Sequence, residues 1–243
     1  MTIVTDKTVL VTGGNRGIGR ALVEEALNRG AKRVYAGTRR PLTHPDKRVT
    51  PLTLEVTDAA QIQQAVHDVG SLDVLVNNAG LALYDDLSDP AVVERHLAVN
   101  LFGPYRMIQA FLPLLTRSGG AVVNNLSINA FAPLPLIPAY SISKAAAFSL
   151  TQSLRALLAS RGVRVHAVMT GPVDTDMTEG LDIPKAAPES VARAIFDGLE
   201  KDEDEIFPDA MAEGMADSWH NGAAKALERQ YAAVAAQVQQ ARP

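Results

Sequence analysis

The stretch "VLVTGGNRGIGRALVEEAL" (residues 9–27) decides the fold, because it has the pattern of a strand, a glycine-rich turn and a helix in succession. Gly13, Gly17 and Gly19 allow the backbone to turn tightly and to approach a pyrophosphate closely. The free N–H groups and the positive dipole end of the following helix favour such an anion. At the first strand–helix junction of the chain, this turn predicts a dinucleotide site; the alternative is a glycine-rich turn that binds no ligand.

Strand-like and helical patterns alternate along the rest of the chain. This alternation predicts a doubly wound parallel sheet of about seven strands, with helices on both faces in the three-layer Rossmann arrangement of the α/β class. The predicted strands are residues 8–13, 33–38, 49–56, 72–78, 121–127 and 164–171, and "EIFP" (205–208) resembles a seventh. We expect a single dinucleotide-binding domain over residues 1–243, with the catalytic site built into it.

Composition and charge exclude several classes of function. A formal net charge of −4 leaves no basic excess to neutralise phosphates, so we expect no nucleic-acid partner. The chain has no cysteine, and its five histidines lack the spacing of metal ligands, so we expect no metal site. The sequence starts with a strand-like run rather than a signal peptide, and no apolar stretch reaches the roughly 18 residues of a membrane span. We therefore expect a cytoplasmic protein without a membrane partner.

The stretch "AYSISKAAA" (139–147) places Tyr140 and Lys144 four residues apart, on one face of a helix. A tyrosine with its ordinary pKa of about 10 is a poor general acid–base near neutrality. Lowering that pKa to about 7 requires roughly 4 kcal/mol, which one ammonium about 4 Å away can supply at an effective dielectric near 20. The pair therefore indicates an activated phenol, although the same spacing also occurs by chance in many helices.

The helix predicted over residues 90–115 contains Pro104, which cannot donate a hydrogen bond to the carbonyl of Asn100. One interpretation is a tolerated kink. The other is that this carbonyl is left free for a functional partner.

The glycine turn has the spacing G-x-x-x-G-x-G after Thr12, and this form resembles the short-chain dehydrogenase/reductase family. Further motifs of that family follow in order: "NNAG" (77–80), Asn100 in "NLFG", Ser127, "YSISK" (140–144) and "TGPVDT" (170–175). The resemblance covers roughly residues 5–200. It implies hydride transfer between a nicotinamide cofactor and a carbonyl compound or an alcohol.

The resemblance also implies the roles of four catalytic residues. Tyr140 would be the general acid/base, and Lys144 would lower its pKa and bind the nicotinamide ribose. Ser127 would orient the substrate oxygen. Asn100 would hold, through its main-chain carbonyl, a water that relays protons to Lys144, which fits the carbonyl freed by Pro104. Thr170 replaces a proline that the family usually has there, and this departure could loosen the loop.

The end of the second strand indicates which nicotinamide cofactor is used. An acidic residue there would bind the ribose of NAD, but the chain has "GTRR" (37–40), and a guanidinium can clasp a 2′-phosphate. Arg16 is a second cation within reach, so we expect NADP(H); merely solvated arginines are the alternative. The cofactor-binding residues that we predict are Gly13, Asn15, Arg16, Gly17, Ile18, Gly19, Thr38, Arg39, Arg40, Glu55, Val56, Asn78, Ala79, Gly80, Tyr140, Lys144, Gly171, Val173 and Thr175.

The segments 129–140 and 176–184 are expected to form the walls of the substrate pocket. Both are apolar and lack a cation before Lys185, which favours an apolar ketone or aldehyde, unless these residues only pack on each other. We therefore expect an NADPH-dependent carbonyl reductase or alcohol dehydrogenase; the alternative is an NADP-binding regulator without turnover. An enoyl reductase would normally space the tyrosine and lysine more widely.

The end of the chain, about residues 204–243, departs from the commonest ending in this family. It carries an apolar helical stripe that we expect to pack on its own domain, with a neighbouring subunit as the alternative. The stripe consists of Leu227, Tyr231, Val234 and Val238. The family resemblance implies a homodimer or a homotetramer.

Overall fold

The computed structural model describes residues 3–240, with side chains through residue 237. Within these residues a single sheet of seven parallel strands has the order β3-β2-β1-β4-β5-β6-β7. The strands are β1 (Thr8–Thr12), β2 (Arg33–Thr38), β3 (Val49–Thr53), β4 (Val74–Asn77), β5 (Ala121–Asn125), β6 (Arg164–Val168) and β7 (Glu205–Ile206). The order reverses between β1 and β4, which is the switch point where doubly wound sheets bind their ligands.

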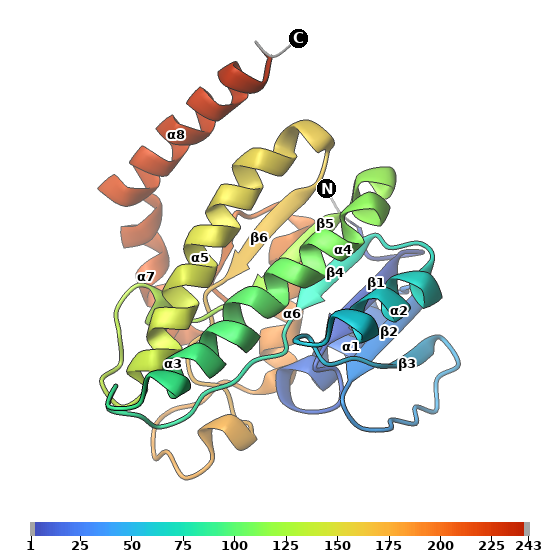
Figure 1. Ribbon diagram of the computed structural model, residues 1–243, viewed down its shortest axis with the longest axis horizontal. Helices are drawn as coiled ribbons and strands as arrows, with labels where there is room; N and C mark the ends of the chain where they lie inside the picture. The colour runs from blue at the N-terminus through green and yellow to red at the C-terminus, as the bar shows by residue number, and fades with distance from the viewer. Residues whose placement is uncertain (1–2, 241–243) are drawn as a thin grey trace.

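Helices cover both faces of the sheet (Figure 1). They are α1 (Gly17–Asn28), α2 (Ala59–Val69), α3 (Pro90–Leu97), α4 (Gly103–Ser118), α5 (Pro138–Leu158), α6 (Pro188–Glu200), α7 (Ala210–His220) and α8 (Ala223–Gln240). Alternate residues of a strand point to opposite faces. Accordingly, Val9 and Val11 pack with α1 and α6, whereas Leu10 packs with α2, α4 and α5. The predicted three-layer arrangement is confirmed.

The helix predicted over residues 90–115 is interrupted. α3 ends at Leu97, a π-helical turn spans Ala98–Phe102, and α4 begins at Gly103. Pro104 lies in the first turn of α4, where a missing N–H is tolerated. The proline therefore marks the start of a new helix after a widened turn, and Asn100 lies inside that turn.

The C-terminal part folds as a short strand followed by two helices. β7 is two residues long, and α8 extends away from the rest of the chain (Figure 1). The exposed fractions of Leu227, Tyr231 and Val234 are 44%, 66% and 56%, so the expectation that this stripe packs on its own domain is wrong for these three residues. Val238 lies outside the residues whose side chains are described. Among the described residues, no helix combines the length and the apolar character needed to cross a bilayer.

Candidate active site

A cleft of about 570 Å³ opens at the carboxyl ends of the strands, around the switch point between β1 and β4. It is lined by the glycine turn, the end of β2, the loop after β4, the first turns of α5 and the loop after β6. The predicted residues that line it are Gly13, Asn15, Arg16, Gly17, Ile18, Gly19, Thr38, Arg39, Glu55, Val56, Asn78, Ala79, Gly80, Tyr140, Lys144, Gly171, Val173 and Thr175. Of the predicted set, Arg40, Asn100 and Ser127 are not among the lining residues.

The glycine turn leaves room for an anion at the start of α1. Gly13 has φ +68°, and a Cβ at Gly19 would collide with the Gly13 carbonyl oxygen, so neither position tolerates a side chain without rearrangement. The N-cap residue of α1, Arg16, makes no side-chain capping bond, and the first turn carries no acidic residue. Backbone N–H groups at this end are therefore available to a pyrophosphate, as the nicotinamide dinucleotides require.

A chain of polar side chains ties the strand ends together beneath the cleft. Asn78 Nδ2 donates to the Thr12 carbonyl at 3.0 Å, and Asn125 Nδ2 donates to Asn78 Oδ1 at 3.0 Å. Thr170 Oγ1 in turn donates to Asn125 Oδ1 at 2.6 Å. The expectation that Thr170 loosens its loop is therefore wrong, because the hydroxyl that replaces the usual proline attaches the loop to β5.

The three predicted phosphate-binding arginines differ in their placement. Arg39 lines the cleft, is 73% exposed at its side chain, and lies 3.6 Å from a Glu55 carboxylate oxygen. Arg16 donates from Nη1 to Asp176 Oδ2 at 2.6 Å, which connects the glycine turn to the loop after β6. Arg40 is exposed and lies outside the lining.

Tyr140, Lys144 and Ser127 meet at one end of the cleft. Tyr140 is hydrogen-bonded to Ser127, and the Lys144 Nζ lies 5.5 Å from the centre of the tyrosine ring. The same Nζ donates to the Asn125 carbonyl at 2.8 Å. Two residues one helical turn apart on α5 and one residue just beyond β5 are thus brought together, as the helical spacing predicts.

The chain's own groups do not bring the pKa of the phenol down toward 7. Burial raises the pKa of Tyr140 to about 12, and the hydrogen bond with Ser127 offsets only part of that rise. Burial also lowers the pKa of Lys144 to about 8. Desolvation is the largest cause of both shifts, and a further positive charge is needed to make the phenol acidic.

The side chain of Asn100 connects the loop after β4 to α5 through hydrogen bonds. Its Oδ1 accepts a hydrogen bond from the Leu81 N–H, and its Nδ2 donates to the Leu81 carbonyl and to Ser143 Oγ, each at 2.8 Å. Ser143 lies on α5 between the tyrosine and the lysine. The buried amide of Asn100 thus fixes the loop after β4 against α5.

A sequence model of the family described as short chain dehydrogenase matches residues 7–185. The chain belongs to the short-chain dehydrogenase family. Its relatives include an uncharacterized oxidoreductase of Staphylococcus epidermidis, 32% identical over 214 residues, which cover 82% of this chain and 93% of the relative. An uncharacterized oxidoreductase of Staphylococcus aureus is 33% identical over 217 residues, with the same coverage of both chains.

Solved structures of other short-chain dehydrogenases agree with this assignment. One from Burkholderia cenocepacia, in complex with NADP, superposes with a TM-score of 0.86 at 36% identity, covering 94% of this chain and 98% of that one. One from Streptomyces avermitilis gives a TM-score of 0.80 at 26% identity, covering 96% and 99%. The chain is therefore an oxidoreductase of the short-chain dehydrogenase family, whose members bind a nicotinamide cofactor.

Several residues of this short-chain dehydrogenase cleft were not predicted. Asp209, the N-cap of α7, accepts a hydrogen bond from the Gly171 N–H at 2.7 Å and so attaches the loop after β6 to the C-terminal part. The lining residues that were missed are Leu54, Thr57, Leu81, Arg95, Ala98, Val99, Asn125, Leu126 and Thr170, whereas Asp176, Met177 and Thr178 belong to the predicted wall 176–184. The asparagine pair in "NNL" (124–126), directly before Ser127, was the available signal for Asn125.

The predicted substrate walls are only partly present in the cleft. Met177 lines it, but Leu134 and Leu136 are 41% and 58% exposed and are not among the lining residues. Phe131 instead stacks on Trp219 of α7, with ring centres 4.8 Å apart. The segment 129–140 therefore packs partly against the C-terminal helices rather than forming a continuous apolar wall.

Proposed function

We propose that this short-chain dehydrogenase is an NADPH-dependent oxidoreductase that interconverts a ketone or aldehyde and the corresponding alcohol. The observation that carries the proposal is the group of Tyr140, Ser127 and Lys144 at one end of a cleft whose other end is a glycine turn suited to pyrophosphate. We take the substrate to be uncharged and largely apolar, because Leu81, Leu126 and Met177 belong to the same lining.

Each catalytic residue has a proton-handling or orienting role in this proposal. A bound nicotinamide cofactor supplies the hydride and, when oxidised, a positively charged ring. With pKa values of about 12 and 8, Tyr140 and Lys144 are both protonated at pH 7, which is the state required to reduce a carbonyl. Ser127 orients the substrate oxygen toward the phenol, Tyr140 donates its proton as the alkoxide forms, and the Lys144 ammonium stabilises the resulting phenolate.

A preference for NADPH follows from the charges around the end of β2. Arg39 presents an exposed guanidinium to the cleft, and no aspartate or glutamate stands in "GTRR" (37–40) to bind a ribose hydroxyl. Arg16 is a second cation in the lining. The complex of the Burkholderia relative with NADP supports the same choice.

The test is NADPH consumption over a panel of aliphatic and aromatic ketones, aldehydes and diketones, with NADH in parallel. We expect turnover of at least one class, with a higher kcat/KM for NADPH than for NADH. Tyr140→Phe is expected to reduce kcat at least about 100-fold while the Kd for NADPH, measured by fluorescence, changes less than about twofold.

Two results would contradict the proposal. NADPH binding without turnover of any compound would favour the regulator. Equal or better use of NADH would remove the assigned role of Arg39.

A further inference from the structure

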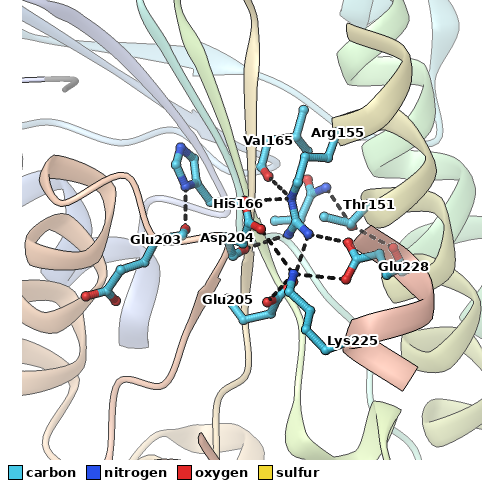
Figure 2. Close-up of polar contacts among 11 residues, drawn as sticks. Thr151, Arg155, Val165, His166, Glu203, Asp204, Glu205, Lys225 and Glu228 are labelled. Atoms are coloured by element: carbon cyan, nitrogen blue, oxygen red, sulfur yellow. Dashed lines mark hydrogen bonds and ion pairs between the residues drawn. The ribbon is translucent and has the colours of Figure 1, made fainter. Parts of the chain in front are cut away.

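A cluster of ion pairs attaches the base of α8 to the body (Figure 2), and no hydrophobic residue of the described part of α8 is buried. The Lys225 Nζ lies 2.8 Å from Glu205 Oε2 of β7 and 2.9 Å from Glu228 Oε2, one turn further along α8. Arg155 of α5 lies between the same two carboxylates, with Nη1 2.8 Å from Glu205 and 2.6 Å from Glu228. The side chain of Lys225 is 2% exposed and that of Glu205 is fully buried. This cluster fixes which face of α8 points inward.

The apolar stripe of α8 lies on the opposite face. With about 100° of rotation per residue, Leu227, Tyr231 and Val234 lie roughly 180–240° around the helix from Lys225. Their exposed fractions of 44–66% agree with that placement. The orientation of α8 is therefore the opposite of that of a typical amphipathic surface helix. The charged side chains of Lys225 and Glu228 face the protein, and the large apolar side chains face away from it. Because the ion pairs fix its base, the helix cannot turn the stripe inward.

The charges and spacing of α8 favour a second copy of the same chain as the partner of this stripe. From Gln230 to Gln240 the sequence "QYAAVAAQVQQ" contains no charged residue, so two such helices do not repel one another. A helix that lies on an anionic membrane instead carries lysines and arginines on its polar face.

The steps of four, three and four residues from 227 to 238 are those of a coiled-coil seam. The spacing of these four positions is the same from either end of the helix. An antiparallel copy would place position 231 opposite 234 and position 227 opposite 238, and a two-fold axis requires such self-complementarity.

We propose that α8 is a self-association surface, in which the stripe of Leu227, Tyr231 and Val234 pairs with the same stripe of a second copy, antiparallel, about a two-fold axis. α8 has 18 residues and is therefore about 27 Å long, so the pair forms a continuous seam from the ion-pair cluster outward.

The test measures the mass of the full chain in solution by light scattering and sedimentation. We expect an oligomer, and we expect Tyr231→Glu/Val234→Glu to produce a smaller assembly, with a Kd raised at least about 100-fold. The matched control is Ala226→Glu/Ala233→Glu, which adds the same charges at exposed positions of α8 away from the stripe and should leave the mass unchanged. Glutamate is a good helix former, so circular dichroism should be the same for both variants.

The orientation is tested by crosslinking, since the chain has no cysteine. A mixture of Tyr231→Cys and Val234→Cys proteins, treated with a short bismaleimide, should give more crosslinked dimer than either protein alone. A monomeric wild type, or an unchanged mass in the Tyr231→Glu/Val234→Glu variant, would overturn the proposal. Stripe-dependent binding of a monomer to phosphatidylserine vesicles would also overturn it and assign the stripe to a membrane.

Discussion

Lys144→Met is expected to abolish reduction and yet to stabilise the fold. Burial lowers the pKa of Lys144 from 10.5 to about 8. A shift of about 2.5 units corresponds to roughly 3 kcal/mol of unfavourable free energy for the charged lysine in the folded protein at pH 7. Methionine fills a similar volume without charge, but it loses the hydrogen bond to the Asn125 carbonyl, which is worth about 1 kcal/mol. The net gain of about 2 kcal/mol corresponds to a rise in Tm of roughly 4–8 °C for a chain of this size.

The stability difference between Lys144→Met and wild type should depend on pH. Between pH 8 and 10.5 the unfolded chain keeps the Lys144 proton and the folded protein has lost it, so wild-type stability rises with pH in this window. The advantage of Lys144→Met should therefore shrink from its value at pH 7 by roughly 2 kcal/mol at pH 9.5. Urea unfolding at the two pH values measures it, with Lys47→Met at an exposed position as the control. A variant that is less stable than wild type at pH 7, or a difference independent of pH, would refute the desolvation account.

Three further substitutions test other contacts. Arg39→Ala should raise the KM for NADPH roughly 10- to 100-fold and change the KM for NADH by less than about twofold in a steady-state assay. Arg40→Ala is the control, because Arg40 lies outside the lining, and it should raise the KM for NADPH less than Arg39→Ala does. Thr170→Val removes the 2.6 Å hydrogen bond to Asn125 and should lower the free energy of unfolding by about 1–3 kcal/mol; unchanged urea unfolding would show that the bond does not hold the loop. Lys225→Met leaves buried Glu205 with one cation fewer and should lower the Tm by roughly 10 °C; an unchanged Tm in a thermal melt would mean that the ion pairs do not anchor α8.

The sheet could be predicted because its strands are buried on both faces. Val9, Leu10 and Val11 of β1, for example, have no exposed surface. A strand buried on both faces appears in the sequence as a short apolar run bounded by glycine or polar residues. The predicted strands continue beyond their observed ends, as in β6, which ends at Val168 rather than Gly171. Beyond Val168 the chain forms a loop, and Thr170 and Gly171 of that loop line the cleft.

The residues proposed to be catalytic could be brought together from local motifs, but the contacts that support them could not be predicted. Tyr140 and Lys144 are related by one helical turn, a relation that is visible in sequence. Asp209 reaches Gly171 from a different element, and Asp176 reaches Arg16 from 160 residues away, so no local pattern indicates either contact. Arg39 and Arg40 are neighbours of the same residue type, and only the structure shows that Arg39 lines the cleft and Arg40 does not.

The two buried lysines show why composition and periodicity alone cannot separate a reactive group from a structural one. Burial lowers the pKa of Lys144, and no carboxylate is among the causes of its shift. Burial acts in the same direction on Lys225, but hydrogen bonds with Glu205 and Glu228 outweigh it and raise the pKa. An unpaired buried ammonium destabilises the fold and is available to stabilise charge that develops beside it, whereas a paired one fixes the position of a helix. Lys→Met should therefore have opposite effects on stability at the two sites, because the partners that determine the sign come from distant parts of the chain.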